Sequence, residues 1–296
     1  FNHMSKKILI DTSSDDEIRV AVTENGKLDD FEIEPNKTNA VKGDVYLAKI
    51  TRVEPSLQAA FVDYGANRHG FLPLTEIHPD YFKIPAIDQE SLKKLSSNLQ
   101  TDDEIDEITS ADNKDELSND NLKENENDHQ IRFNNKRDYL HFFKKYKIQE
   151  VIKPRQVILV QINKEERGLK GAALTTFLSF AGRYCVLMPN SLNNDGISRK
   201  IADIGERKKL KLILASVSIP EKMSVIIRTA GIGKTKKEIS KDLDFLTSQW
   251  NSIRKTTLKS AAPTIIYEEG NIIKRTIRDL LTKDVDEVLI DGKNGY

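Results

Sequence analysis

The chain of 296 residues is long enough for about two domains, and 38% of its residues are apolar and 31% charged. Its 46 basic and 46 acidic residues cancel, which excludes a uniformly basic nucleic-acid binder but allows a locally basic one. One cysteine excludes a disulfide scaffold or a cysteine-based zinc cluster within the chain, and Cys185 is predicted to be a buried thiol. No apolar run approaches the ~18 residues of a transmembrane helix, so we expect a soluble, cytoplasmic protein.

The balanced total hides a strongly acidic segment. Residues 102–128 hold twelve Asp or Glu and two Lys, a local charge of 2 − 12 = −10, and no aromatic residue. Such a segment buries too little surface to offset the entropy of ordering it, so we expect residues 85–135 to be a disordered or loosely helical insertion. It is either a solvated spacer or an electrostatic mimic that competes with RNA for a basic surface. The basic, aromatic stretch 132–147 is predicted to re-enter the fold as a helix.

The first part of the chain predicts short strands. Residues 1–3, which precede Met4, are expected to be a remnant of expression and are left out of the fold. Strands are predicted over 6–11, 17–22 and 28–33, and Asn25-Gly26 between the last two is a strong hairpin signal.

Five more short strands follow, with the acidic segment before the fourth. They are predicted over 45–53, 57–64, 69–72, 157–162 and 172–177. Five short strands with one long excursion indicate a small closed barrel of the OB type.

An α/β region comes next. Strands are predicted over 184–188 and 224–228 with a helix over 206–217 between them, and a capping-box spacing at Thr235 opens a long helix. The apolar positions of that helix share one face, so its Trp250 is predicted to belong to the core. A hairpin over 265–273, a helix over 275–281 and a strand over 287–291 complete the pattern.

Aromatic and basic residues gather on the predicted barrel. Phe61, Tyr64 and Phe71 lie on or beside adjacent strands, with Arg68 in the joining turn and Lys170 before the last strand. Exposed aromatics on an OB face stack on bases, and nearby cations bind phosphates. The alternative is that the phenylalanines fill the barrel interior.

A second candidate is the strand end at residues 228–235. An arginine and a threonine there precede a Gly-containing turn and a helix N-terminus, all of which favour anions. The segment is no P-loop, because the first glycine of that motif would fall on Arg228. A plain capped helix is the alternative.

A third candidate is a pair of carboxylates, since Asp11 and Asp291 each end a predicted strand. Paired carboxylates can hold Mg²⁺, but further ligands cannot be placed and we favour a structural role. No serine, cysteine or metal-type catalytic pattern is present, so no catalytic or metal-ligating residue is predicted in this chain.

Four blocks closely resemble the bacterial ribonuclease E/G family of endoribonucleases: residues 50–74, 161–190, 196–200 and 226–235, which include AAFVDYG, GLKGAAL, GISRK and IIRTAGIGKT. The resemblance covers nearly the whole chain outside the insertion. It implies an α+β protein of several subdomains, and the E form is favoured over the shorter G form.

The resemblance also implies a division of the chain. A split RNase H-like subdomain would occupy 4–39 and 274–296, an S1-like OB barrel with the acidic insertion 40–176, and an α/β 5′-sensor region 177–273. The RNA-binding residues implied by the matched motifs are Phe61, Phe71 and Lys170, beside Tyr64 and Arg68. The residues implied to bind a 5′-monophosphate are Gly182, Val186, Arg228 and Thr229, with Arg199 a weaker candidate.

The implied activity is that of a longer protein: single-strand-specific endonucleolytic cleavage in mRNA decay and rRNA processing, stimulated by a 5′-monophosphate. Its Mg²⁺-binding acids and zinc-linking cysteines would belong to a DNase I-like catalytic domain absent here, so the chain alone is expected to be inactive. The implied partners are single-stranded RNA, a homotetramer and degradosome proteins, in the cytoplasm or at the inner membrane surface. The rival hypothesis is a non-enzymatic OB-fold RNA-binding adaptor.

Overall fold

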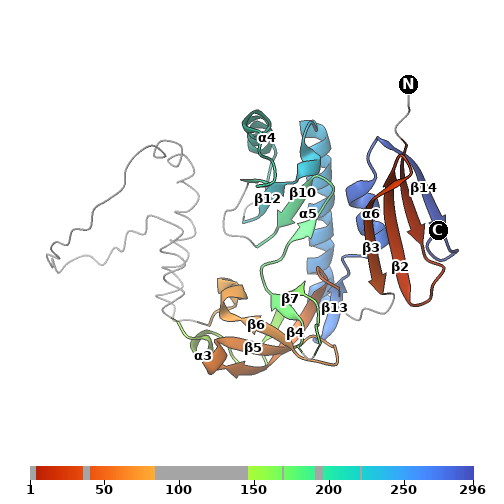
Figure 1. The fold of residues 1–296 in the computed structure, drawn as a ribbon. Coiled ribbons are helices and arrows are strands. Elements are labelled where there is room, and N and C mark those ends of the chain that lie inside the picture. Colours follow the sequence, from red (N-terminus) through yellow and green to blue (C-terminus); the bar gives the residue numbers. More distant parts are fainter. Residues whose placement is uncertain (1–4, 36–40, 84–145, 169, 191–195, 221) are drawn as a thin grey trace, which may run out of the picture.

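The computed structural model describes residues 5–35, 41–83, 146–168, 170–190, 196–220 and 222–296. The acidic insertion and nearly all of the helix predicted over 132–147 lie outside these residues. The described chain forms three units, each with its own apolar core: a sheet built from the two ends of the chain, a barrel, and an α/β unit (Figure 1).

The first unit is a four-stranded sheet in the order β14-β1-β2-β3. Its strands are β1 (Lys6–Asp11), β2 (Glu17–Glu24), β3 (Lys27–Pro35) and β14 (Val285–Asp291). Asn25 and Gly26 both have positive φ, as a tight turn between right-twisted strands requires, and they confirm the predicted hairpin. The last strand pairs in parallel with the first, and helix α6 (Ile272–Leu280) packs its buried Ile272 into the sheet's core.

The second unit is a closed barrel of five strands. They are β4 (Val45–Glu54), β5 (Ala59–Asp63), β6 (Gly70–Pro73), β7 (Val157–Lys164) and β8 (Ala173–Thr175). The order is β4-β5-β6-β8-β7, and β7 pairs with β4 to close the circle, which is consistent with the predicted OB-type fold. Leu57, predicted to start a strand, lies in a 3₁₀ turn over Pro55–Leu57. Two further 3₁₀ turns, Leu74–Glu76 and Pro79–Tyr81, follow β6, and the short helix α3 (Ile148–Val151) precedes β7.

The third unit is a sheet in the order β11-β12-β10-β9 with two helices. Its elements are β9 (Phe180–Ala181), β10 (Cys185–Met188), β11 (Gly196–Ile197), α4 (Ile204–Ser216), β12 (Ser224–Ile227), the 3₁₀ turn Thr229–Gly231 and α5 (Lys236–Lys259). The predicted capping box of Thr235 and Glu238 opens α5. Trp250 packs on Phe180 at 6.0 Å between ring centroids, which confirms its place in the core.

The hairpin predicted over 265–273 is wrong. Strand β13 (Thr264–Tyr267) pairs instead with β4 of the barrel. After Gly270 the side chain of Asn271 accepts a hydrogen bond from the backbone of Lys274, so it caps a helix at the point where a second strand was expected. The helix predicted over 275–281 is therefore confirmed but begins at Ile272.

The barrel and the third unit share a packed boundary. The barrel strands β4 and β7 turn Val45, Leu47 and Leu159 outward into the core of the third unit, while their alternate residues fill the barrel. The barrel and the third unit therefore share part of one apolar core. None of the described helices is long and apolar enough to span a membrane.

Candidate nucleic-acid interface

A row of side chains crosses the outside of the barrel from strand to strand. Arg52 on β4 lies opposite Phe61 on β5, and Phe61 lies opposite Phe71 on β6. The two rings meet edge to face with centroids 6.1 Å apart, and the Arg52 guanidinium lies 4.7 Å from the Phe61 ring centroid. Both rings are partly exposed. This arrangement provides two aromatic surfaces and a cation on one face, as a site for stacked bases and their phosphates requires.

The position of Arg52 depends on an irregularity in β4. Ile50 pairs with Val62 and is buried, and strict alternation would place Arg52 on the same inner face. A β-bulge between them places Arg52 opposite Phe61 instead. The Thr51 hydroxyl, inside the bulge, donates to the Phe61 carbonyl oxygen at 2.9 Å. Arg52 is thus a candidate RNA-binding residue that sequence reasoning missed, because the bulge shows only in the pairing.

Tyr64 is a correction to the predicted RNA-binding set. Its side chain is 1% exposed and packs edge to face on Tyr46 inside the barrel, beside the fully buried Val62. Its hydroxyl donates to Glu166 at 2.7 Å, and burial together with that carboxylate raises the pKa of Tyr64 far above its usual value. Tyr64 lies on the face of β5 opposite to Phe61, so no base can stack on it. The alternative that the phenylalanines fill the interior is excluded by the same alternation.

The two predicted cations of this surface lie on adjacent turns. Arg68 is exposed and donates from its Nη1 to the carbonyl of Gly168, which joins the turn before β6 to the turn before β8. Gly171 fits so closely against His69 that an added Cβ would lie 2.1 Å from the His69 carbonyl oxygen. The exposed Lys170 precedes this contact. The turns that carry Arg68 and Lys170 are therefore adjacent at one end of the barrel, next to the start of β6 and its Phe71.

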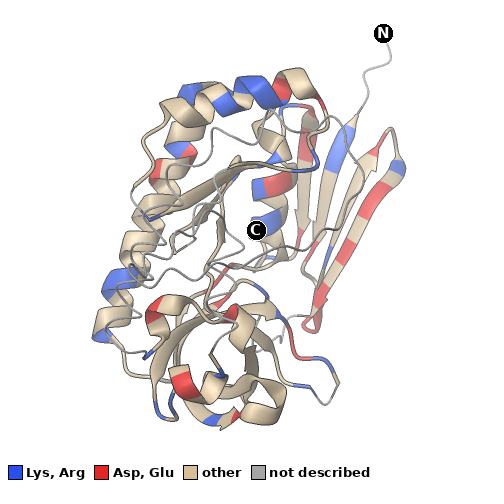
Figure 2. Cartoon of the chain, turned by 90° about the vertical axis from the view of Figure 1, so that its left-hand side faces the viewer, with Lys and Arg blue, Asp and Glu red and all other residues tan. Residues whose placement is uncertain are grey.

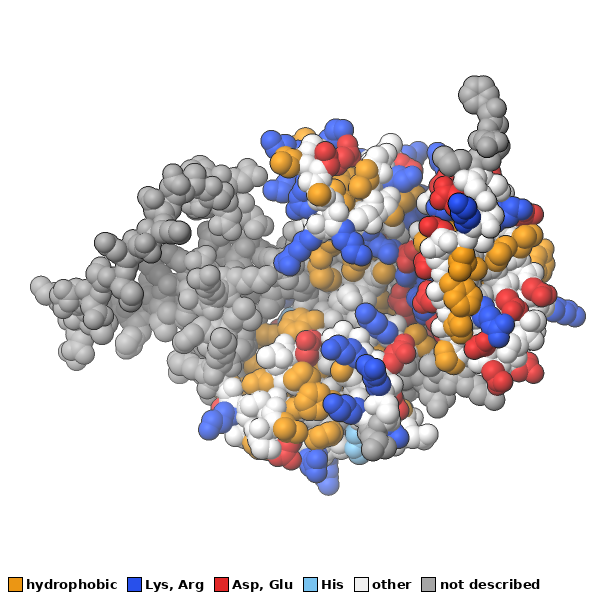
Figure 3. Space-filling view, in the orientation of Figure 1, with side chains coloured by type: hydrophobic (Ala, Val, Ile, Leu, Met, Phe, Trp, Pro, Cys, Tyr) orange, Lys and Arg blue, Asp and Glu red, His pale blue; other side chains and the backbone are white. Residues whose placement is uncertain are grey.

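Basic side chains border the apolar ones on this part of the molecule. Figure 3 shows exposed hydrophobic side chains next to Lys and Arg on the visible face of the barrel. On the first sheet, by contrast, acidic side chains form bands along the edge strand β3 (Figure 2). The charge balance of the whole chain therefore does not describe the barrel face, which combines cations with aromatic rings.

The predicted phosphate-binding residues gather at one end of the third sheet. Strands β11 and β12 are parallel, so Arg199 and Arg228, which follow them, lie at the same end. Strand β10 is antiparallel and pairs Val186 with Ile226, two residues before Arg228. Val186, Ile226 and Arg228 thus lie on one face of the sheet. The residues buried between them along both strands point to the opposite face, into the core with α5.

Arg228 and Thr229 supply side-chain hydrogen-bond donors at this end of the third sheet. The backbone N–H of Arg228 donates to Tyr184 at 2.7 Å, and its Nη1 donates to the carbonyl of Gly182 at 2.6 Å and to Asp279 at 2.7 Å. Thr229 is exposed as the first residue of a 3₁₀ turn, and its hydroxyl makes no hydrogen bond within the described part of the chain. An arginine fork beside a free hydroxyl is suited to an anion with several oxygens.

Gly182 lies in a turn that a carboxylate of α5 holds in place. Asp242 accepts hydrogen bonds from the backbone N–H groups of Arg183, Tyr184 and Cys185 at 2.8–3.0 Å. A Cβ on Gly182 would lie 2.5 Å from Asp242 Oδ2, so the turn requires glycine. The N–H of Gly182 donates to Cys185 and its carbonyl accepts from Arg228. Gly182 therefore sets the shape of the turn and the position of Arg228.

Cys185 is a buried thiol, as predicted. Burial and the nearby Asp242 raise its pKa to about 12, so the thiol is protonated at neutral pH.

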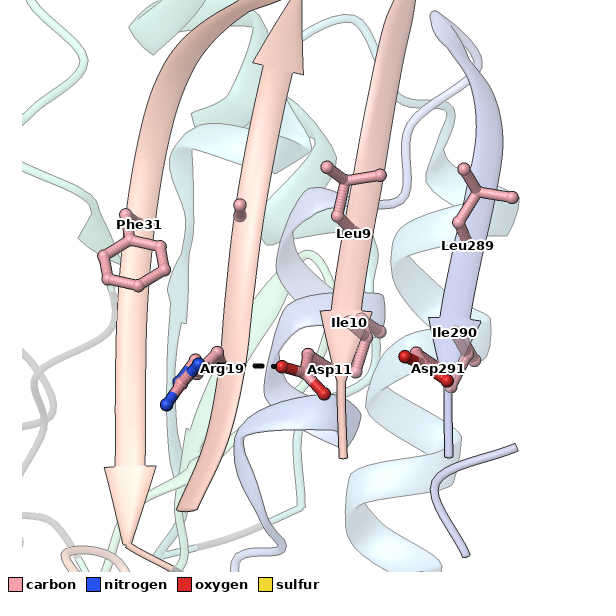
Figure 4. A pocket seen from close by; sticks show the side chains of 9 residues that line it. Leu9, Ile10, Asp11, Arg19, Phe31, Leu289, Ile290 and Asp291 are labelled. Atoms are coloured by element: carbon pink, nitrogen blue, oxygen red, sulfur yellow. Dashed lines mark ion pairs between the residues drawn. The ribbon is translucent and has the colours of Figure 1, made fainter. Parts of the chain in front are cut away.

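The carboxylate pair lies away from both surfaces. Asp11 and Asp291 are partners in the parallel pairing of β1 and β14, at the edge of a cavity of about 450 Å³ on the outer face of the first sheet (Figure 4). Asp11 accepts hydrogen bonds from Ser13 and faces Arg19 at 3.9 Å, and the bonds from Ser13 lower its pKa. The described residues contain no group of three or more His, Cys, Asp or Glu that could hold a metal ion.

Comparison with known proteins matches two regions of the chain. Residues 179–296 match the Ribonuclease E/G family model and residues 40–112 the S1 RNA binding domain. The chain is 40% identical over 287 residues to Ribonuclease E of Buchnera aphidicola subsp. Schizaphis graminum and to that of Escherichia coli K12. These alignments cover 97% of this chain and 24% and 22% of those proteins. It is 25% identical to Ribonuclease G of E. coli K12, over 99% of this chain and 49% of that protein. The chain thus spans about a quarter of the length of its ribonuclease E relatives.

Proposed function

We propose that this chain, which belongs to the ribonuclease E/G family, is the RNA-recognition part of a single-strand-specific endoribonuclease that senses a 5′-monophosphate end. The observation that carries the proposal is the row of Arg52, Phe61 and Phe71 across the outside of a closed barrel that matches an S1 RNA binding domain. Two adjacent rings can each take a base, and the cations around them take the backbone phosphates. Stacking on these rings does not distinguish one base from another. The row therefore fits binding of single-stranded RNA without a preference for a particular sequence.

The 5′-sensing part of the proposal is supported by the grouping of Arg228, Thr229, Val186 and Arg199 at one sheet end. A terminal monophosphate carries more charge and one more free oxygen than an internal phosphodiester, so an arginine fork and a hydroxyl can prefer it. Val186, beside them on the same face, offers an apolar surface to the first nucleoside. Gly182 keeps the turn below Arg228 in the shape that this arrangement needs.

Cleavage itself is assigned to other parts of a longer protein. The described residues of this chain contain no group of three or more His, Cys, Asp or Glu that could hold a metal ion. The metals stay predictions for the rest of that protein. The same holds for a tetramer, degradosome partners and a role in mRNA decay. The RNase H-like assignment of the first sheet also stays a prediction. The rival, a non-enzymatic adaptor, shares the barrel surface but gives no reason for the grouping around Arg228.

Binding of this chain to short single-stranded RNA tests the proposal. The two RNAs are identical except for a 5′-monophosphate or a 5′-hydroxyl, and the salt concentration is fixed because salt alone changes such affinities by orders of magnitude. We expect tighter binding to the monophosphate. In Arg228→Ala this preference should fall roughly 10- to 150-fold, the worth of a lost charge-assisted hydrogen-bonding group, with the hydroxyl RNA unaffected.

The matched control is Arg254→Ala, which removes an exposed arginine from the far part of α5 and should leave the preference intact. Equal losses on both RNAs in Arg228→Ala would reject a phosphate-specific role. Equal binding of both RNAs by the unmodified chain would leave an RNA platform without a sensor.

A further inference from the structure

A carboxylate from outside the third unit contacts the proposed phosphate-binding arginine. Asp279 lies on α6, the helix that packs Ile272 and Thr276 against the first sheet, and its Oδ1 accepts from Arg228 Nη1 at 2.7 Å. Both side chains are partly buried, at 26% exposure for Arg228 and 30% for Asp279. The contact joins residues 51 positions apart and two different units of the fold.

The geometry uses one edge of the guanidinium and leaves the other open. Nη1 carries two hydrogens, and its two acceptors, the Gly182 carbonyl and Asp279, account for both. In the part of the chain that the structure describes, Nε and Nη2 of Arg228 have no hydrogen-bond partner. That free edge presents parallel N–H groups, the arrangement that takes two oxygens of one phosphate.

Asp279 is itself held in place from its other side. Arg278 contacts it through Nε at 3.0 Å and Nη2 at 3.3 Å. Nη1 of Arg278 donates to Glu269 at 2.6 Å and to the carbonyl of Ala181 at 3.2 Å. Two arginines and two carboxylates sum to zero charge, so Asp279 does not leave the region negative. The hydrogen bonds from Arg228 and Arg278 lower the pKa of Asp279, although burial opposes them, and keep it ionised.

We infer that Asp279 is a positioning residue for 5′-end recognition: it fixes the Nη1 edge of Arg228 so that the Nε–Nη2 edge is preset for a terminal phosphate. The inference rests on the proposed function of Arg228. Without Asp279 the arginine keeps its charge but loses one of the two contacts that hold its plane. The Arg228 side chain then has to become ordered when the phosphate binds, and this entropic cost lowers the affinity for the phosphate. The third unit's discrimination of the 5′ end thus depends on helix α6, which belongs to the first unit.

The test measures the ratio of affinities for 5′-monophosphate and 5′-hydroxyl RNA in the 296-residue chain. We expect Asp279→Ala to reduce the ratio roughly five- to tenfold, less than Arg228→Ala, and Asp279→Asn to retain part of it because an amide oxygen can still accept from Nη1. Affinity for the hydroxyl RNA, which depends on the barrel, should not change in any of these variants. Asp284→Ala, which removes an exposed aspartate paired with Lys6 at 3.3 Å, is the matched control.

The outcomes separate the two proposals. If Arg228→Ala lowers the ratio and Asp279→Ala does not, the positioning role is rejected and the phosphate site stands; a higher ratio would mean that Asp279 competes with phosphate. If Arg228→Ala leaves the ratio unchanged, the phosphate site fails and the role of Asp279 with it. Should Asp279→Ala fail to fold, Asp279→Leu, which has a similar volume but cannot accept from Nη1, replaces it, and an unchanged ratio in that variant rejects the inference.

Discussion

Replacing Phe61 with alanine tests whether the barrel face is the RNA platform. The substitution removes the central ring of the row, with its edge contact to Phe71 at 6.1 Å and the Arg52 guanidinium 4.7 Å from its centroid. A base stacked on an aromatic side chain is worth about 1–3 kcal/mol, so the dissociation constant should rise roughly 5- to 150-fold. The upper part of this range applies if Arg52, deprived of the ring beneath it, also loses its place.

The assay is fluorescence anisotropy with a labelled 5′-hydroxyl single-stranded RNA, which keeps the proposed phosphate site out of the measurement. Phe61 is partly exposed, so truncation should cost less stability than the 3–5 kcal/mol of a buried phenylalanine, and the melting temperature confirms that the variant is folded.

Two further variants make the result specific. Phe31→Ala removes a phenylalanine that is 50% exposed on the first sheet and should leave affinity unchanged. Phe61→Trp keeps a stacking surface and should restore most of the affinity. If Phe61→Ala binds RNA as tightly as Phe31→Ala does, the barrel face is not a base platform and the row has to be explained as packing alone.

Three other outcomes follow from the same structure. Arg52→Gln should weaken both RNAs alike and reduce the slope of log affinity against log salt by about 0.7, the loss of one phosphate contact on a single strand; an unchanged slope would place Arg52 off the RNA path. Gly182→Ala should lower the melting temperature by several degrees and reduce the 5′-monophosphate preference, because the added Cβ would lie 2.5 Å from Asp242 Oδ2; wild-type behaviour would show that the turn can relax. With its pKa raised to about 12, Cys185 should resist alkylation at pH 8 in the native chain and react on unfolding; rapid native labelling would contradict its burial.

Local chemistry accounts for the parts of the fold that could be predicted. Asn25-Gly26 adopts the positive φ angles that a tight hairpin needs, and Thr235 with Glu238 forms the capping box that its spacing predicts. The errors have equally local causes. The hairpin predicted over 265–273 places a second strand after Gly270, but Asn271 caps a helix there, and its cap favours the helix over a strand.

The buried position of Tyr64 follows from the alternation of side chains along β5. Residues of a strand alternate between faces, so Tyr64 shares a face with Val62 and opposes Phe61. Either Val62 and Tyr64 or Phe61 had to face the barrel interior, and the apolar Val62 indicates that its own face is the inner one. The same alternation fails for Arg52, because the bulge after Ile50 reverses its face. A single-residue bulge leaves no mark in composition or periodicity, so this cation could be found only from strand pairing.

The contact between Arg228 and Asp279 lies beyond any local rule, because it follows from how the two ends of the chain meet. Parallel pairing of β1 with β14 sets the first sheet, and Ile272 and Thr276 seat α6 upon it. The next turn of that helix brings Arg278 and Asp279 to the end of the third sheet, where Arg183 also donates to the carbonyl of Leu281. A sequence motif can identify Arg228 as an anion-binding candidate. Which edge of its guanidinium stays free depends on Asp279, which lies 51 residues away on α6. If Arg228 binds the terminal phosphate as proposed, the specificity of the site is a property of the assembled units, and we expect substitutions in α6 to alter 5′-end discrimination without contacting RNA.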